Sequence, residues 1–215
     1  MSVLVITAVD AERDAVLRDV TSTPEQPLHV VVGGVGPVAA AVSTMAALAA
    51  FPETSLVVSA GIAGGFRGRI EEGEIAVANR VTFADLGART DAGHLTLHEM
   101  GLRQDSSYVA DDSDITNRLA HTSVRVVTGE ILTLACMTGI DDDARWLAAR
   151  HPRAIAEAME GFAVAAAAQR VGLPFAEIRA ISNAIGKRDP TTWNMQSAFD
   201  ALSQAFAKLV EEPLP

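Results

Sequence analysis

Three polar side chains stand in or beside apolar segments that a folded chain would bury. Glu12 follows the apolar run Val3–Ile6, Glu160 lies in an alanine-rich and almost uncharged segment, and Asn183 ends another apolar run. A carboxylate that packs inside a protein must be paired or hydrogen-bonded, so we expect Glu160 to meet either a buried cation or the hydroxyl pair of a ligand. Glu12 is more typical of a first-turn helix acid, although it also lies where the ligand crevice of an α/β sheet opens. The amide of Asn183, which can both donate and accept hydrogen bonds, should point into the same crevice.

Two glycine-rich segments also follow apolar runs. Gly34–Ala39 fits the G-x-G-x-x-A pattern of a dinucleotide site, but the acid that should end the next strand is missing there. We therefore expect a tight turn from strand to helix. Gly61–Gly65 could be a turn or a close approach of the backbone to a ligand, and it lacks the Gly-Lys-Ser/Thr of a phosphate loop.

Metal and cofactor chemistry find little support in the residue pattern. His94 and His98 are four residues apart, as two metal ligands on a helix would be, but the glycines around them argue against a helix. We expect solvated loop histidines and no metal site. The single cysteine, Cys136, forms neither an internal disulfide nor a cysteine-based zinc site. No cofactor is expected.

Composition excludes several classes of partner. The chain has 215 residues, 17 basic and 27 acidic side chains and a net charge of −10, which argues against binding to nucleic acid. No uncharged run of 18 apolar residues predicts a membrane span, and the N-terminus lacks the basic region of a signal peptide. We expect a soluble, acidic, cytoplasmic globular protein.

The elements that must position these side chains alternate between strands and helices. Strands are predicted at 3–6, 28–32, 56–59, 74–83, 124–128, 131–136 and 175–181. Helices are predicted at 10–19, 37–50, 141–150, 155–171 and 196–210. This order is typical of an α/β fold with a largely buried sheet, and no linker interrupts it, so residues 1–215 are expected to form one domain.

Five short segments, in this order and spacing, resemble the nucleosidases of the purine nucleoside phosphorylase superfamily. They are Ala8–Glu12, Gly33–Gly36, Ala60–Gly65, Ala158–Gly161 and Arg179–Asn183. The resemblance covers nearly the whole chain. It implies a single-domain nucleoside phosphorylase-like fold, with a central mixed β-sheet flanked by helices, and a homo-oligomer, most often a dimer.

Within the superfamily, Asn183, the following segment Ile185–Pro190 and Trp193 are most similar to the futalosine hydrolases of a menaquinone pathway. Methylthioadenosine and S-adenosylhomocysteine nucleosidases carry an aspartate at the position of Asn183. An asparagine offers its NH₂ to a purine O6 and its carbonyl to N7–H, which suits a 6-oxopurine. The resemblance therefore implies hydrolysis of futalosine, an inosine-like nucleoside, with release of hypoxanthine and dehypoxanthine futalosine.

The same resemblance implies a role for each site residue. Glu12 would activate water as general base, Glu160 would bind the ribose hydroxyls, and Asn183 would bind the purine edge. Further contacts to the ribose and base are implied for Ile62, Ala63, Gly64, Met137, Thr138, Met159 and Trp193.

Three other functions remain open at this level. The chain could be a methylthioadenosine/S-adenosylhomocysteine nucleosidase, a phosphorylase, or a nucleoside-binding sensor without turnover. A carboxylate at Glu12 would repel phosphate, whereas Arg67 and Arg69 near the second glycine cluster keep a phosphorylase possible. The candidates for binding the benzoate carboxylate of futalosine are Arg67, Arg89, Arg145 and Arg188.

Overall fold

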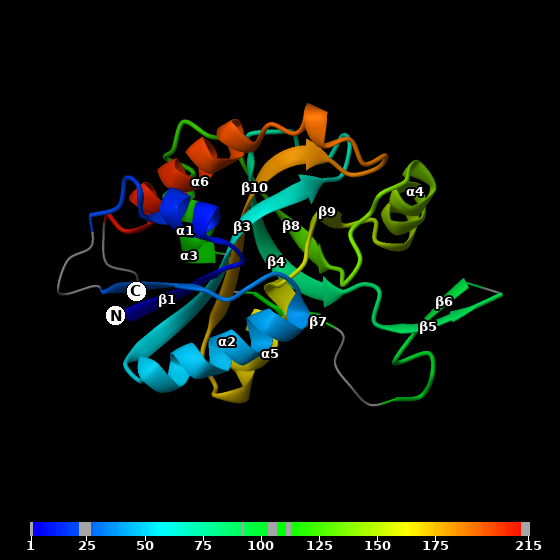
Figure 1. Cartoon of the computed structure of the whole chain (residues 1–215), viewed down its shortest axis with the longest axis horizontal. Helices are drawn as coiled ribbons and strands as arrows, with labels where there is room; N and C mark the ends of the chain where they lie inside the picture. Colours follow the sequence, from blue (N-terminus) through cyan, green and yellow to red (C-terminus); the bar gives the residue numbers. More distant parts are fainter. Residues whose placement is uncertain (1, 22–26, 92, 103–106, 111–112, 212–215) are drawn as a thin grey trace.

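A mixed sheet with helices on both faces organises the chain. The computed structural model describes residues 2–21, 27–91, 93–102, 107–110 and 113–211 (Figure 1). The strands are β1 (Ser2–Thr7), β2 (Leu28–Val32), β3 (Thr54–Gly65), β4 (Ile75–Phe83), β5 (Gly87–Thr90), β6 (Gly93–Thr96), β7 (Ser107–Val109), β8 (Val126–Thr133), β9 (Ala154–Ala158) and β10 (Phe175–Ala184). The helices are α1 (Asp10–Leu17), α2 (Pro37–Ala50), α3 (Ser113–Leu119), α4 (Asp141–Arg150), α5 (Gly161–Arg170), the 3₁₀ turn η1 (Pro190–Thr192) and α6 (Met195–Leu209).

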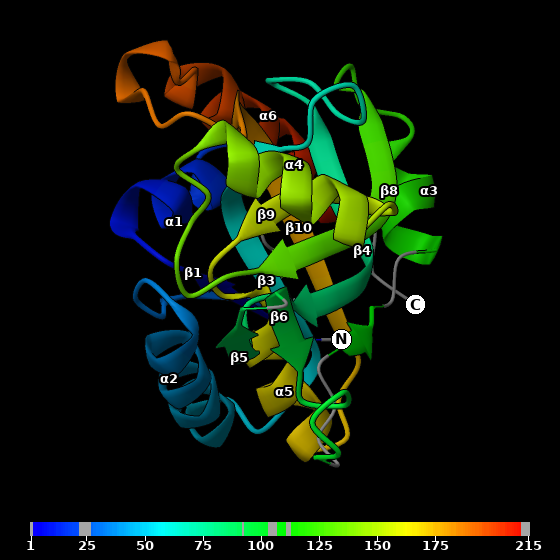
Figure 2. The same ribbon diagram turned by 90° about the vertical axis from the view of Figure 1, so that its right-hand side faces the viewer.

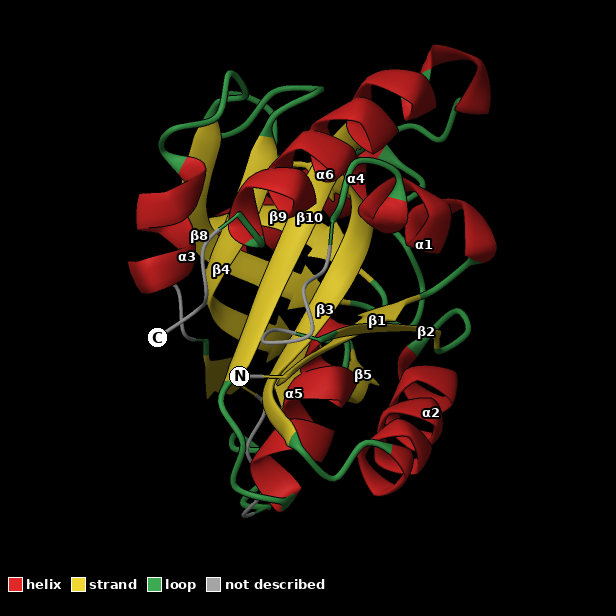
Figure 3. Cartoon of the chain, turned by 90° about the vertical axis from the view of Figure 1, so that its left-hand side faces the viewer, coloured by secondary structure: helices red, strands yellow, loops and turns green. Residues whose placement is uncertain are grey.

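Strand pairing brings the central strands into a nearly closed ring. β10 runs between β3, to which it is parallel, and β4, to which it is antiparallel (Figure 3). β4 continues in parallel to β8 and β8 to β9, and β9 returns to β3 as an antiparallel neighbour. β1 and β2 extend the sheet from β3 as parallel strands. The predicted central mixed β-sheet is thus confirmed.

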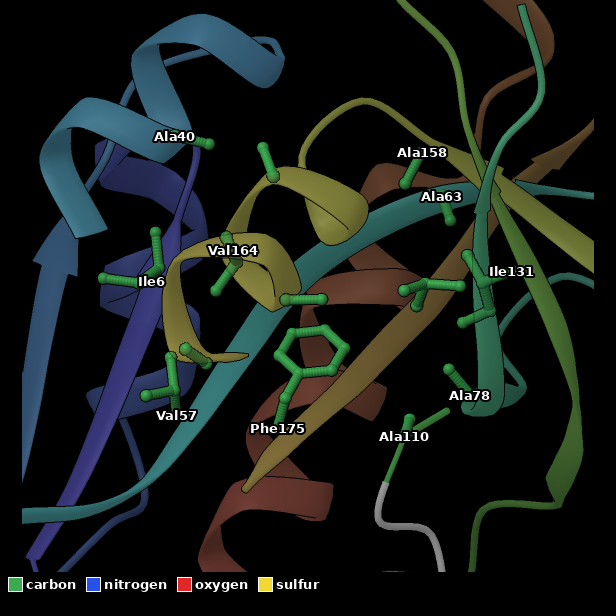
Figure 4. Packing of buried hydrophobic residues seen from close by; sticks show 14 of the residues in the cluster. Ile6, Ala40, Val57, Ala63, Ala78, Ala110, Ile131, Ala158, Val164 and Phe175 are labelled. Carbon is green, nitrogen blue, oxygen red and sulfur yellow. The ribbon is translucent and has the colours of Figure 1, made fainter. Parts of the chain in front are cut away.

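Two apolar layers hold the helices against the sheet. Figure 1 shows α1, α3 and α6 on one side of the sheet and α2 and α5 on the other. Side chains from the β strands and from α2 and α5 meet in one layer, where Ile6, Val57, Val164 and Phe175 are buried (Figure 4). A second layer packs α1 and α6 against the opposite face. Burial of these apolar side chains is the main favourable term in folding.

One predicted helix is wrong, and the correction moves a site residue. Residues 155–171 were expected to form one long helix, but Ala154–Ala158 is the buried strand β9 and α5 begins only at Gly161. Alanine favours helices by propensity, but a short segment enclosed by β8 and β3 gains more by completing the sheet. Glu160 therefore lies at the junction of β9 and α5, outside the helix.

Two glycine segments lie within strands, although the sequence left a turn open for Gly61–Gly65 and predicted a break at Gly129. Gly61–Gly65 belongs to β3 and pairs with β10, and Gly129 lies within β8, which replaces the two strands expected on either side of it. Both segments face bulky neighbours, since a Cβ on Gly129 would lie 2.6 Å from Ile155. Glycine serves here for close packing of side chains across the sheet.

The remaining elements surround one end of the sheet. Figure 2 shows α4 on the side from which the β5–β6 hairpin also projects. α4 packs through Leu147 onto a small cluster that contains Phe66 and Ile185. Within the described residues, no helix is long and apolar enough to cross a membrane.

Candidate active site

A cavity of about 240 Å³ opens where the segments after β1 and β8 meet the ends of β3, β9 and β10. The sequence predicted ten ligand-contacting residues, and the structure brings all ten to this cavity. They are Glu12, Ile62, Ala63, Gly64, Met137, Thr138, Met159, Glu160, Asn183 and Trp193. Residues up to 181 positions apart thus share one wall, as expected for a ligand site at the ends of sheet strands.

Glu12 is held in the first turn of α1 by backbone N–H groups. Its Oε2 accepts from the N–H of Ala8 over 2.8 Å and from that of Val9 over 3.3 Å, and its Oε1 accepts from Ile62 over 2.9 Å. The side chain is 3% exposed. Three donors therefore fix a buried carboxylate at the cavity wall.

Gly61 provides the space that this carboxylate needs. A Cβ at Gly61 would lie 2.3 Å from Glu12 Oε1 and 2.8 Å from the guanidinium of Arg179. A larger residue would displace one or both groups. The second glycine cluster thus leaves space for the side chains of Glu12 and Arg179. The sequence alone could not distinguish this role from that of a turn.

Glu160 meets both a backbone donor and a cation. Its Oε1 accepts from the N–H of Gly36 over 3.0 Å, and its Oε2 lies 3.2 Å from Arg179 Nη2. The first glycine segment therefore turns from β2 into α2 as expected, and it also orients Glu160. The sequence allowed two kinds of partner for Glu160, a buried cation or the hydroxyl pair of a ligand. The structure shows the buried cation, Arg179.

Sequence reasoning missed Arg179, which lies behind the cavity. This residue is 1% exposed, and its Nε lies 2.8 Å from Glu177 Oε1 while its Nη2 donates to the hydroxyl of Ser59 over 2.9 Å. The charges of Glu177, Glu160 and Glu12 raise the pKa of Arg179, and burial raises the pKa of Glu177. A charged residue inside an apolar strand pattern was the signal that could have identified it.

Asn183 ends β10 with its amide oriented by its neighbours. The Ser182 hydroxyl donates to Asn183 Oδ1 over 2.8 Å, and Asn183 Nδ2 donates to the carbonyl oxygen of Ala184 over 3.1 Å. A side-chain amide has two N–H donors and two acceptor lone pairs. One donor and one acceptor position therefore remain for a ligand.

A second missed residue is Glu157, on β9. The side chain is 5% exposed and lines the cavity, where its Oε1 accepts from the N–H of Thr138 over 2.9 Å and its Oε2 from the Thr138 hydroxyl. Burial raises the pKa of Glu157, with a further contribution from the charge of Asp85. The incorrect prediction of a helix over residues 155–171 hid this position, because it did not show on which side of the segment Glu157 lies.

The cations at the cavity are Lys187 and Arg188, in the loop after β10. The guanidinium of Arg188 lies 5.1 Å from the centre of the Trp193 ring, and Asp141 accepts from the backbone N–H of Lys187. Of the four arginines considered for a substrate carboxylate, Arg188 alone lines this cavity.

The other three arginines lie elsewhere. Arg67 and Arg145 line a separate hollow beside α4, and Arg145 is paired with Asp142. Arg89 is on the β5–β6 hairpin. Arg69 donates to the carbonyl oxygens of Ala148, His151 and Ala154, so neither it nor Arg67 supplies a phosphate site at the cavity.

Among the described residues, neither His94 nor His98 belongs to a cluster of metal-binding side chains. His94 lies on β6 with its ring 6.0 Å from that of Trp146, and His98 follows β6 in a turn. Across the described part of the chain, no group of three or more His, Cys, Asp or Glu side chains could hold a metal ion.

Comparison with known proteins identifies the family of this chain. Residues 15–214 match the model of the phosphorylase superfamily. Futalosine hydrolase of Streptomyces coelicolor is 41% identical over 97% of this chain and 95% of its own length. A 5'-methylthioadenosine/S-adenosylhomocysteine nucleosidase of Colwellia psychrerythraea is 30% identical over 76% of this chain and 70% of its own.

Solved structures share the fold. The native structure of futalosine hydrolase of Helicobacter pylori superposes with a TM-score of 0.82, covering 98% of this chain and 97% of that one, at 15% identity. The high identity to the Streptomyces relative extends over nearly the full length of both chains. The chain therefore belongs to the phosphorylase superfamily and, within it, to the futalosine hydrolase family.

Proposed function

We propose that this enzyme hydrolyses the N-ribosidic bond of futalosine and releases hypoxanthine. The observation that carries the proposal is the convergence of Glu12, Glu160 and Asn183 on one cavity in a chain 41% identical to a futalosine hydrolase. In the reaction, the bond between C1′ and the purine nitrogen breaks and the hydroxyl of water joins C1′. The base leaves with the electron pair and takes up a proton.

Glu12 has the position and surroundings of a general base. Its carboxylate is fixed by three backbone donors and accepts a proton from water as the water attacks the sugar. General base catalysis of this kind contributes roughly 10²–10⁴-fold to a rate. Binding alone does not need such a group, so its presence favours an enzyme over a nucleoside sensor.

Glu160 is suited to the ribose. Cleavage of glycosidic bonds passes through an oxocarbenium-like transition state, whose positive charge a nearby carboxylate stabilises. Each oxygen of Glu160 already has one partner, and each retains acceptor capacity for a ribose hydroxyl. Met159, the residue before it, lies at the same wall.

Asn183 supports a 6-oxopurine as the leaving group. The donor and the acceptor that remain on its amide match O6 and the protonated N7 of hypoxanthine. An amide cannot supply the N7 proton, so that proton comes from water or from another group. An aspartate at this position would accept a hydrogen bond from the exocyclic amine of adenine. This chain has asparagine there, and this difference disfavours the methylthioadenosine alternative.

Water is favoured over phosphate as the acceptor. Arg179, the buried cation nearest to Glu12 and Glu160, is already balanced by three carboxylates. A phosphate ion that enters beside Glu12 would meet its carboxylate, while the guanidinium of Arg179 is already paired with Glu160 and Glu177. Charge repulsion at that position favours a hydrolase.

We further propose a homo-oligomer, with a dimer as the expected form. Val38, Val42 and Met45 lie on one face of α2 and are 77%, 67% and 41% exposed. An apolar stripe of this kind on a chain of net charge −10 is typical of a contact between subunits.

Incubation of the purified enzyme with futalosine, inosine and methylthioadenosine tests the proposed substrate. Chromatography should detect hypoxanthine from futalosine, with far less base released from the other two nucleosides. Preferred release of adenine from methylthioadenosine would establish the alternative nucleosidase. Binding of all three without turnover would establish the sensor.

A further inference from the structure

Glu157 stands in one row of the sheet with Asn183. Gly64 on β3 is the pairing partner of Glu157 on β9 and, on its other side, of Asn183 on β10. Residues that pair directly across a sheet project to the same face. Glu157 and Asn183 therefore flank Gly64, and all three line the cavity.

Gly64 lets the side chains of Glu157, Asn183 and Ile185 pack closely around it. A Cβ there would lie 2.7 Å from Ile185 Cγ2, 3.5 Å from Glu157 Cγ and 3.7 Å from Asn183 Nδ2, so a larger residue would displace these groups from the cavity wall. Two strand spacings separate the outer members of the row, about 9.5 Å between backbones. The row thus presents a carboxylate and an amide, on either side of Gly64, to a ligand in the cavity.

A structural role alone accounts poorly for the carboxylate. Glu157 anchors Thr138 through two hydrogen bonds, but a neutral glutamine could accept the same backbone N–H without the cost of burying a charge. Each carboxylate oxygen keeps acceptor capacity beyond its bond to Thr138. An ionised carboxylate accepts hydrogen bonds and donates none, so it selects a ligand that presents an N–H.

We propose that Glu157 is a specificity-determining residue that accepts a hydrogen bond from N1–H of a 6-oxopurine while Asn183 binds its O6 and N7 edge. This inference rests on the proposed function and extends it to the choice of base. A 6-aminopurine has a lone pair at N1 in place of N–H, and that lone pair would face the carboxylate. Discrimination between the two bases then comes from both sides of the row.

The test compares Glu157→Gln with wild type on futalosine and on its analogue in which adenine replaces hypoxanthine. A glutamine replaces the charge-assisted bond to N1–H with a weaker neutral one, so kcat/KM should fall about 10- to 100-fold for futalosine. Because its NH₂ can donate to the N1 lone pair, the adenine analogue should lose nothing or improve. Thr138→Val is the matched control, because it removes the hydroxyl bond to Glu157 and leaves the carboxylate. Thr138→Val should change kcat/KM by the same factor for both substrates.

Glu157→Gln could instead lower kcat/KM equally on both substrates, to the same extent as Thr138→Val. That result would show that Glu157 only anchors the loop, and it would overturn the inference. Calorimetric binding of free bases to the wild type needs neither a variant nor turnover. Hypoxanthine should bind about 10-fold or more tightly than 1-methylhypoxanthine, which lacks N1–H. Equal affinities would also overturn the inference, whereas absent turnover of futalosine with this preference intact would reject only the proposed substrate.

Discussion

Removal of the buried cation behind the cavity should destabilise the protein severely. Arg179 is 1% exposed and contacts Glu177 at 2.8 Å, Ser59 at 2.9 Å and Glu160 at 3.2 Å. In Arg179→Met, the carboxylates of Glu177 and Glu160 would stay buried without a counterion. Breaking a buried ion pair from one side costs about 3–5 kcal/mol, a large part of a total stability of about 5–15 kcal/mol.

Urea denaturation and thermal melting measure this loss. The free energy of unfolding should fall by about 3–5 kcal/mol and the Tm by about 6–20 °C. Adding Glu177→Gln should recover part of the loss, because the most deeply buried charge is then neutral. The control is Arg145→Met, whose partner Asp142 is 80% exposed, and it should change stability by less than about 0.5 kcal/mol.

A loss below about 1 kcal/mol in Arg179→Met, or no recovery in the double variant, would refute the view that one guanidinium balances these acids. Arg179 also fixes one oxygen of Glu160, so the variant should raise KM even where it remains folded. Normal KM with normal stability would contradict both parts of the argument.

Three further predictions concern the cavity. Glu12→Gln should lower kcat by about 10²–10⁴-fold while calorimetry shows that hypoxanthine still binds, and unchanged kcat would remove Glu12 from the role of general base. Asn183→Asp should shift kcat/KM toward 6-aminopurine nucleosides in a competition assay, and an unchanged ratio would refute the role given to the amide. Because burial raises the pKa of Glu157, the folded protein binds this proton more tightly than the unfolded chain does. Wild-type stability is therefore lost as the pH rises from the unfolded pKa through the folded pKa, so Glu157→Gln should gain in urea stability relative to wild type as the pH rises above the usual pKa of a glutamate. A stability difference that does not change with pH would contradict the raised pKa.

Strong local patterns predicted much of the fold. The strand Leu28–Val32 and the helices Pro37–Ala50 and Asp141–Arg150 have the expected bounds, because an apolar β-branched run, a first-turn proline and an acidic first turn act within the segment itself. The alanine-rich residues 154–158 misled the prediction, since their strand conformation depends on neighbours from distant parts of the chain.

The site was predictable where a motif carries it and hidden where strand register decides it. The motif residues Glu12, Glu160 and Asn183 meet at the cavity as expected. The pairing of Arg179 with Glu160, and the row of Glu157, Gly64 and Asn183, follow from the alignment of β3 with β9 and β10. Register of this kind is set by packing across the whole sheet, and no short segment of the sequence reports it.

The central claim is that water, and not phosphate, attacks the sugar of futalosine. Mass spectrometry of the products formed in phosphate-free buffer and in buffer with added phosphate tests it most directly. We predict equal rates of hypoxanthine release in both buffers and a free sugar hydroxyl at C1′. Release that requires phosphate, together with a sugar 1-phosphate, would contradict the account.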